Sequence, residues 1–296
     1  MLPNTLLMSE RLSNWILFIL LSIIWGSSFI LMKKGLLGLS AFQVASVRIV
    51  AAGIFLLPIA IRSFKTIPSK KMGIVFLSGT FGSLLPAYLF CVAEQKIESS
   101  LAGSLNSLTP IFAIITGYAF FKNKPSFNKL IGILIAALGC WLLYFSRAKS
   151  SEGANLSYVL WIMLATLFYG FNVNMVQRYL KEIPSLNIVS VAMLLNAIPA
   201  FFVLMYSGFF QLDLTSSVVV NATLFSMGLG IVGTSVANIL FYVLIKKSGV
   251  VFSSMVTYGI PFVAILWGVI DKEKVGWMIV LSLSVILAGV YQANRR

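Results

Sequence analysis

The sequence predicts an all-α integral membrane protein with ten transmembrane helices in two inverted five-helix repeats. First, the 296 residues are 59% hydrophobic and only 10% charged, with a mean hydropathy of +0.97. Second, apolar runs of about 20 residues, each long enough to cross the hydrocarbon of a bilayer as a helix, recur along the whole chain. Third, one part of the chain matches a later part after a shift of 151 residues.

The apolar runs are predicted to be helices because lipid-exposed backbone must satisfy its own hydrogen bonds. The strands of a membrane barrel would alternate apolar and polar residues, which these runs do not. The first run follows Arg11, as in a signal peptide, but no small-residue cleavage site follows it, so we expect it to be retained. The expected helices span residues 14–33, 42–62, 72–93, 99–121, 127–146, 156–177, 187–208, 218–244, 249–270 and 275–293.

The internal repeat is the strongest pattern in the chain. Over residues 79–117, ten of 39 positions are identical to the residue 151 positions later, including the pairs Gly82–Gly233 and Pro110–Pro261. Each repeat holds five spans, an odd number, so the second enters the membrane in the opposite sense. Inverted repeats of this kind are typical of secondary transporters, which bind their substrate near mid-membrane. We place the repeats at residues 1–148 and 149–296, joined through a polar segment.

The distribution of basic residues predicts the orientation. With the N-terminus inside, the cytoplasmic loops and tails hold fourteen Lys and Arg residues and the exterior loops hold seven. This is the positive-inside pattern, and it predicts cytoplasmic termini and a multi-pass protein of the inner (plasma) membrane. The net charge of +14 is therefore attributed to topology, and no nucleic acid partner is expected.

The sequence lacks the residues that several kinds of catalytic and metal-binding site require. The sequence contains no histidine, which excludes histidine-based catalytic dyads, metal sites and proton relays. Cys91 and Cys140 both lie in expected spans and have no metal-ligand or disulfide spacing. No phosphate-binding G-x-x-x-x-G-K-[ST] loop is present. We therefore expect no enzyme activity, no cofactor and no metal.

Polar residues interrupt two apolar spans at matching places. "NSLTPIFAIITG" at 106–117 and "YGIPFVAILWG" at 258–268 carry Pro110 and Pro261 near the middle of their helices. Proline removes a backbone hydrogen bond, so both are expected to kink their helix and free a carbonyl. The alternative is that these residues only shape helix packing.

The sequence resembles the drug/metabolite transporter superfamily in its EamA-type branch. The stretches that carry the resemblance are "IIWGSSFILMKKGL", "ASVRIVAAGIFLLP", "YLFCVAEQKIESSLAGSLNSLTPIFAIITGYAFF", "LFYVLIKKSGVVFSSMVTYGIPFVAILWGVIDKE" and "AGVYQ". The resemblance implies a ten-helix bundle with a central cavity lined by its helices 1, 3, 4, 6, 8 and 9, and with helices 5 and 10 peripheral. The sequence departs from the family pattern at Lys122, where an acidic residue is usual, although the second repeat has Glu273.

Polar and aromatic residues deep in the expected spans are the candidate binding groups, because such groups seldom face lipid. Arg48 also lies within a span, where a structural role is favoured and recognition of a substrate carboxylate or phosphate is the alternative. Tyr169 and Asn172 share a helical face. The candidate substrate-binding residues are Trp25, Ser28, Tyr88, Asn106, Thr109, Tyr169, Asn172, Asn238 and Tyr258.

These patterns favour a secondary transporter of small organic metabolites, amino acids or similar solutes, acting by alternating access. The resemblance implies that movement is often outward, so an exporter or exchanger is expected. The expected partners are a small-molecule solute and the lipid bilayer, with the chain a monomer or weak homo-oligomer. Glu94, Asp271 and Glu273 are expected at outer helix ends, which favours uniport or solute exchange over proton coupling. The alternatives are a membrane-embedded enzyme acting on lipid-linked substrates and a non-transporting membrane scaffold.

Overall fold

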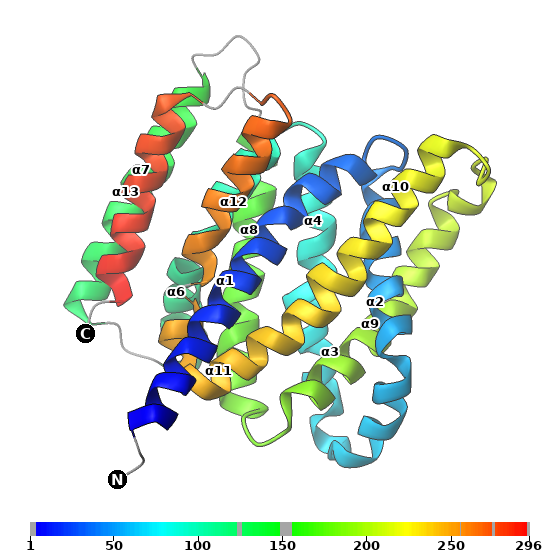
Figure 1. Cartoon of the computed structure of the whole chain (residues 1–296), viewed down its shortest axis with the longest axis horizontal. Coiled ribbons are helices and arrows are strands. Elements are labelled where there is room, and N and C mark those ends of the chain that lie inside the picture. Colours follow the sequence, from blue (N-terminus) through cyan, green and yellow to red (C-terminus); the bar gives the residue numbers. More distant parts are fainter. Residues whose placement is uncertain (1–3, 123–125, 149–155, 255, 274–275, 295–296) are drawn as a thin grey trace.

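The computed structural model of the chain describes residues 4–122, 126–148, 156–254, 256–273 and 276–294 (Figure 1). Every regular element in this part is helical. The elements are α1 (Asn4–Gly35), α2 (Ala41–Ser63), η1 (Phe64–Thr66), η2 (Ser69–Lys71), α3 (Met72–Gly79), η3 (Thr80–Leu84), α4 (Leu85–Glu94), α5 (Ser99–Asn106), α6 (Thr109–Phe121), α7 (Phe127–Ala148), α8 (Leu156–Tyr179), α9 (Ser185–Tyr206), η4 (Phe209–Gln211), α10 (Ser217–Gly228), η5 (Leu229–Val236), α11 (Ala237–Ser254), α12 (Val256–Ile270) and α13 (Trp277–Asn294).

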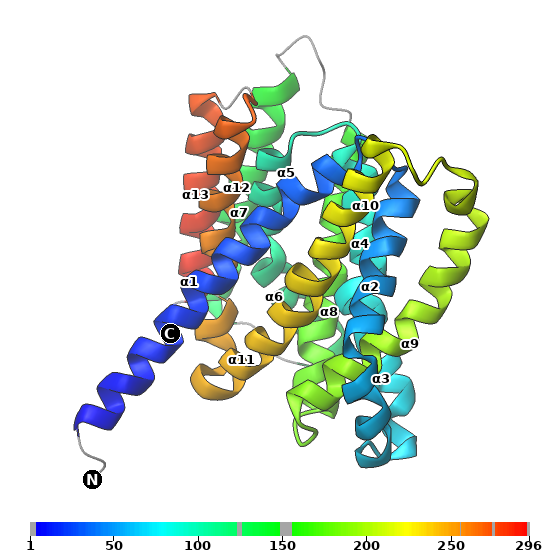
Figure 2. The same cartoon turned by 45° about the vertical axis from the view of Figure 1, so that its right-hand side comes forward.

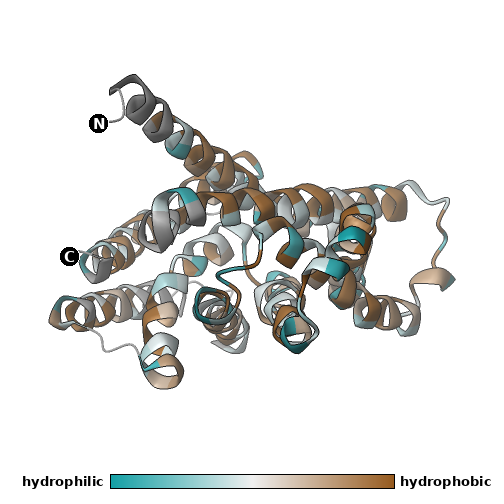
Figure 3. Cartoon of the chain, turned by 90° about the horizontal axis from the view of Figure 1, so that it is seen from below, coloured by the Kyte–Doolittle hydropathy of each residue, from teal (hydrophilic) through white to brown (hydrophobic). Residues whose placement is uncertain are grey.

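The helices have the lengths and the surface of a membrane bundle. Among the described residues, seven helical stretches are long and apolar enough to cross a membrane, and three shorter apolar helices bring the total to the ten expected. Large apolar side chains such as Ile54 and Phe202 are exposed on the outside of the bundle, and hydrophobic residues dominate its helices (Figure 3). A surface of this kind suits contact with lipid rather than with water.

The two repeats interlock, and one helix pair stands at the edge. α2 packs along α9, α1 packs against α12, and α6 packs against α8, so each of these pairs joins the first half of the chain to the second. α7 and α13 pack on each other beside the rest of the bundle (Figures 1 and 2), as the resemblance implied for helices 5 and 10. The first helix begins and the last helix ends at the same end of the bundle (Figure 1).

Local sequence signals fix where α2 begins. The Ser40 side chain accepts a hydrogen bond from the Gln43 N–H, and the Gln43 side chain accepts one from the Ser40 N–H. This capping box satisfies two backbone donors that the helix start would leave unpaired. The Gln43 amide also donates to the Ser207 carbonyl at 2.9 Å, which ties the start of α2 to the end of α9.

Two π-helical segments occupy matching places in the two repeats. η3 and η5 interrupt the third and eighth spans, and the shift of 151 residues carries Thr80 to Ile231 and Leu84 to Ser235, both inside η5. Wide π turns are frequent at functional sites because they re-aim backbone groups. The glycine pair Gly82 and Gly233 lies within these two segments.

The structure corrects two expectations about helix geometry. Pro110 does not kink a continuous helix, because the span breaks into α5 and α6 and the proline stands in the first turn of α6. That position suits proline, since the N–H of a first-turn residue has no helical partner. Pro261 does lie inside the continuous helix α12. α11 extends to Ser254, ten residues beyond its expected end at 244.

Candidate solute-binding cavity

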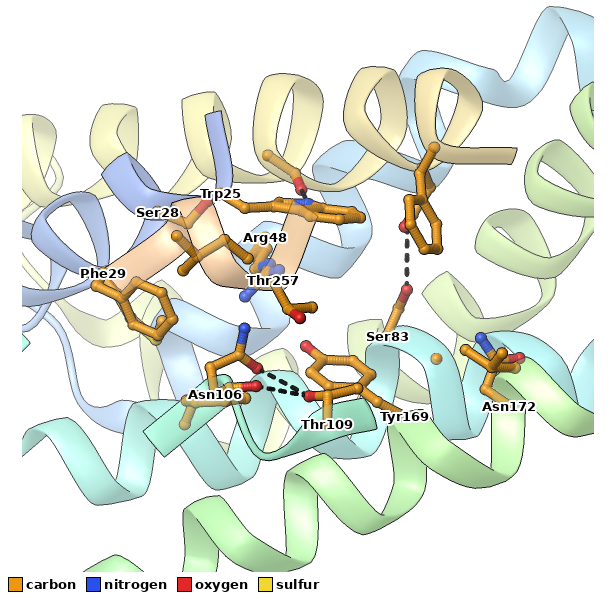
Figure 4. Close-up of a pocket in the computed structure, with 18 of the residues that line it drawn as sticks. Trp25, Ser28, Phe29, Arg48, Ser83, Asn106, Thr109, Tyr169, Asn172 and Thr257 are labelled. Carbon is orange, nitrogen blue, oxygen red and sulfur yellow. Dashed lines mark hydrogen bonds between the residues drawn. The ribbon is translucent and has the colours of Figure 1, made fainter. Parts of the chain in front are cut away.

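A cavity of about 850 Å³, including open space at its mouth, lies between the two repeats. α1, α2, η3, α4, α5 and α6 form its wall from the first half, and α8, η5, α11 and α12 form it from the second. It has the mixed polar and apolar lining of a small-molecule site (Figure 4). Its lining residues are Trp25, Ser28, Phe29, Met32, Arg48, Gly82, Ser83, Phe90, Asn106, Thr109, Tyr169, Asn172, Val173, Gly233, Asn238, Phe241, Tyr242, Thr257 and Ile260.

Most of the lining consists of pairs that the internal repeat relates. A shift of 144 residues relates α1 and α2 to α8 and α9, where Trp25–Gly26 matches Tyr169–Gly170, and the shift of 151 relates the residues from Gly79 onward. Fourteen of the nineteen lining residues form seven such pairs. They are Trp25 and Tyr169, Ser28 and Asn172, Phe29 and Val173, Gly82 and Gly233, Phe90 and Phe241, Asn106 and Thr257, and Thr109 and Ile260.

Aromatic rings form the apolar walls. The Trp25 ring meets Phe241 edge to face, with centroids 5.0 Å apart, and Phe90 stacks near Tyr169 with centroids 6.1 Å apart. The Trp25 Nε1 donates a hydrogen bond to the Gly233 carbonyl at 3.0 Å, so the wide turn of η5 supplies the acceptor that this partly buried indole needs.

Polar side chains with spare hydrogen-bonding capacity face the same space. Asn106 accepts hydrogen bonds from the Thr109 hydroxyl, through its carbonyl at 2.8 Å and its side-chain oxygen at 3.4 Å (Figure 4). Among the described residues, the Asn106 amide nitrogen and the Tyr169 hydroxyl have no hydrogen-bond partner. Asn172 Oδ1 is buried and has no partner at standard geometry in that part of the chain, although the Tyr242 hydroxyl lies near it. A solute can satisfy groups left in this way.

Arg48 lines the cavity and also makes a structural bond to the second half of the chain. Its side chain is 8% exposed, and its Nε donates to the Thr234 hydroxyl at 2.8 Å. The terminal nitrogens Nη1 and Nη2 have no protein acceptor among the described residues. Figure 4 shows them directed to the space shared by Asn106, Tyr169 and Thr257.

Of the nine predicted binding residues, the structure brings seven together in the cavity, and Tyr88 and Tyr258 lie outside its lining. The Tyr88 hydroxyl is 2.7 Å from the Ser46 hydroxyl, so it joins α4 to α2. Tyr258 packs, partly buried, against the main hydrophobic core. Both side chains point to neighbouring helices, a distinction that position within a span does not reveal.

Two further asparagines in the spans make structural contacts between helices. Asn174 donates to the Ala113 carbonyl at 2.8 Å, which joins α8 to α6. Asn196 donates to the Phe76 carbonyl at 3.0 Å and accepts from the Thr80 hydroxyl, which joins α9 to α3 and η3.

A charged cluster closes the bundle at the end where α1 and α12 terminate. We define it as Lys33, Lys34, Asp271 and Glu273. Lys33 pairs with both carboxylates at 2.8 Å, and Lys34 pairs with Asp271 at 2.6 Å. Glu273 also accepts hydrogen bonds from the Ser99 and Ser100 N–H groups, both at 3.1 Å, and so caps the start of α5.

The cluster holds its carboxyl groups ionised. The hydrogen bonds from Lys33 and then Lys34 lower the pKa of Asp271 below its ordinary 3.8. Burial opposes ionisation of Glu273, but the hydrogen bonds from Lys33 and from the Ser100 backbone outweigh it and lower its pKa below 4.5.

The opposite end has a smaller latch at the related place. The shift of 144 residues relates Lys34 to Arg178, and the Arg178 Nη1 donates to the Phe121 carbonyl at 3.0 Å. This bond joins α8 to the end of α6, as the charged cluster joins α1 to the end of α12.

Eleven of the lining residues, besides Arg48, were not among the predicted binding residues, and the repeat could have identified two of them. Thr257 and Ile260 are the counterparts of the predicted residues Asn106 and Thr109. No sequence signal distinguishes the remaining apolar residues, such as Met32, from core residues.

The chain is similar to known transporter sequences along its whole length. The model of the EamA-like transporter family matches residues 13–145 and again 156–295. An "Uncharacterized transporter" of Archaeoglobus fulgidus is 26% identical over 289 residues, which cover 96% of this chain and 100% of that relative. "Solute carrier family 35 member F5" of Macaca fascicularis is 23% identical over 158 residues, 50% of this chain and 36% of that protein. A solved crystal structure covers 96% of both chains, with a TM-score of 0.63 at 14% identity, and has the same fold.

Proposed function

Because the chain belongs to the EamA-like transporter family, we propose that it is a secondary transporter that carries small organic metabolites through the cavity between its repeats. The solutes have a polar end that hydrogen-bonds to groups such as Asn106 and Tyr169 and an apolar part that packs on Trp25. Amino acids and similar solutes fit this description.

The observation that carries the proposal is the pairing of lining residues across the repeat. Seven pairs, taken from both halves, contribute to one cavity. In an inverted-repeat transporter the substrate site lies where the halves meet, and rocking of the halves exposes it to one side and then to the other. A scaffold needs no such paired lining, and none of the residues that line the cavity is a carboxylate or histidine that could serve an enzyme as general acid or base.

The two latches are the elements that we expect to alternate. In the proposed cycle, the charged cluster holds α1 to α12 at one end while the α8–α6 contact at Arg178 loosens, and the second half-cycle reverses this. Each latch is a small set of polar contacts between packed helices, and it can exist in two discrete arrangements.

We propose uniport or solute exchange in the export direction, in an inner membrane, with both termini in the cytoplasm and the chain acting as a monomer or weak homo-oligomer. Glu94 and the acidic members of the charged cluster lie at helix ends, and none of them lines the cavity. No carboxylate is therefore placed to couple solute movement to protons inside the cavity. No cofactor is required.

Counterflow in proteoliposomes tests this function. Vesicles with the purified chain and preloaded with an unlabelled metabolite should take up the same labelled metabolite faster than protein-free vesicles do. A panel of amino acids, aromatic acids, amines and neutral amides covers the solutes that the cavity admits. Uptake equal to that of protein-free vesicles for the whole panel contradicts the proposal.

A further inference from the structure

The cavity contains one charged side chain, and its charge has no counter-ion at bonding distance. No carboxylate of the described residues lies within 4.0 Å of the Arg48 guanidinium, and the cavity lining contains no acidic residue. Glu94 lies within electrostatic range of Arg48 but outside the lining. A guanidinium removed from water is costly to hold without a partner anion.

The guanidinium is held in a fixed orientation that leaves its outer edge available. The bond from Nε to Thr234 uses one side of the planar group, and Thr234 belongs to η5, which packs on α2. Nη1 and Nη2 then present donors with the spacing that matches two oxygens of a carboxylate or phosphate.

The neighbouring polar groups add donors rather than acceptors at this place. The Asn106 amide nitrogen and the Tyr169 hydroxyl face the space into which Arg48 points (Figure 4). Each can donate a hydrogen bond to an anionic oxygen, and the aromatic walls leave room for an apolar body. The site therefore offers positive charge and donors at one end and rings at the other.

The internal repeat shows that this charge is a local addition. The shift of 144 residues relates Arg48 to Ala192, a small apolar residue, while most of the lining has a counterpart in the other half. Helix packing that is common to both halves would not require a charged residue in only one of them, so the packing of α2 does not explain Arg48.

We propose that the transported solutes are small organic anions, with a carboxylate or phosphate group held by Arg48 and an apolar or aromatic body packed on the rings. This inference rests on the proposed function, because it names the solute class of the same cavity. The purely structural alternative assigns Arg48 only the bond to Thr234.

Ligand binding to the purified full-length chain distinguishes the two roles. The probes are phenylacetate, phenyl phosphate and the neutral phenylacetamide, and the readout is the shift of the unfolding midpoint at rising probe concentration. We expect at least one anion to bind at millimolar concentration and the amide to bind much more weakly. Comparison of phenylacetate with phenyl phosphate identifies which acid group fits.

Three variants complete the test. Removal of the charge in Arg48→Gln should weaken anion binding about 10- to 100-fold, as expected for a charge-assisted hydrogen bond. Arg48→Lys should give intermediate binding. Thr234→Val removes the structural bond and retains the charge, so it lowers stability but should largely preserve the preference for anion over amide.

The outcomes separate this inference from the proposed function. Equal binding of anion and amide by the wild type, unchanged anion binding by Arg48→Gln, or binding of neither anion overturns the inference. Counterflow of neutral or cationic solutes at equal rates in wild type and Arg48→Gln would also overturn the inference about anions, but it would support the proposed transport function. Arg48-dependent anion binding without counterflow of those anions supports the site and contradicts transport.

Discussion

The indole Nε1 of Trp25 donates a hydrogen bond to the carbonyl oxygen of Gly233, 3.0 Å away, and so joins α1 of the first repeat to the π-helical segment η5 of the second. The bond fixes the ring as a wall of the cavity. It also occupies a backbone acceptor at mid-span, where water is scarce.

This bond is tested by a variant that keeps the ring and removes the donor. Trp25→Phe should lower the free energy of unfolding by about 1–3 kcal/mol, because the buried Gly233 carbonyl loses its partner. The matched control is Trp277→Phe, since Trp277 is 73% exposed on the outside of the bundle. Denaturation in detergent, followed by circular dichroism, measures the effect, and equal stability of the two variants would contradict the role of the bond.

Close packing of η5 on α2 gives a second prediction. A Cβ at Gly230 would overlap the Arg48 main chain, whereas a Cβ at Gly228 would meet nothing within 4 Å. Gly230→Ala should therefore destabilise the protein by about 1–3 kcal/mol, the typical result of overpacking. Gly228→Ala should be neutral or slightly stabilising, because alanine is the better helix former. Thermal unfolding of both variants decides, and a tolerated Gly230→Ala would show that the two helices can separate without loss.

The charged cluster predicts a dependence of stability on acid pH. A carboxylate whose pKa is lowered by folding stabilises the protein above its ordinary pKa, and the contribution disappears as the pH falls through the lowered value. For Asp271 and Glu273 the ordinary values are 3.8 and 4.5, so their contribution should be constant from pH 7 to pH 5 and should fall below that.

A double variant isolates that contribution. Asp271→Asn combined with Glu273→Gln should be less stable than the wild type at pH 7, and the difference should shrink at acid pH. Unfolding midpoints measured for both proteins across this range give the comparison. A difference that does not change with pH would assign the effect to something other than charge.

The orientation of the chain is tested by cysteine labelling in a variant with Cys91 and Cys140 replaced by alanine. Ser69 and Ser126 are exposed at loops expected in the cytoplasm, and Leu214 is exposed in a loop expected outside. Cysteines at the first two positions should react only in inverted vesicles, and a cysteine at position 214 only in intact cells. Ser151 is also expected outside but is not among the described residues. Labelling of positions 69 and 214 from the same side would contradict the predicted topology.

The absence of proton coupling is a separate prediction. An imposed pH gradient alone should not drive uphill accumulation in vesicles, because no carboxylate lines the cavity. Glu94 is the residue to examine if it does, since it is buried at the end of α4 and its carboxylate oxygens have no hydrogen-bond partner at standard geometry among the described residues. Accumulation that collapses with a protonophore and is lost in Glu94→Gln would replace uniport or exchange by proton coupling through Glu94.

The sequence predicts the fold well because its signals are physical necessities of the bilayer. The length of the spans, the odd number of spans in each repeat, and the glycine and proline pairs such as Gly82 and Gly233 can all be recognised without knowledge of the tertiary structure. The break at Pro110 was missed because a first-turn proline and a mid-helix proline leave the same mark in an apolar run.

The cavity is predictable only in part. Asparagines and tyrosines at mid-span must find partners, but whether the partner is a neighbouring helix, as for Tyr88, or a cavity, as for Tyr169, depends on rotation about the helix axis. Arg48 was assigned a structural role because its counterpart is apolar. The fold gives Arg48 both a bond to Thr234 and a place in the lining of the shared cavity, and neither the cavity nor the Thr234 contact could be located from the sequence.

Solute flux in proteoliposomes, measured in cavity variants, is the most direct test of transport through the cavity between the two repeats. Trp25→Ala, Asn106→Ala and Tyr169→Ala each alter the lining, and the matched controls Trp277→Ala and Tyr206→Ala remove exposed rings far from it. Each cavity variant, folded and inserted, should lose at least about tenfold in flux, as removal of a contact of about 1.4 kcal/mol implies, while the controls should retain wild-type rates. Wild-type flux in all three cavity variants would show that solute does not pass through this cavity.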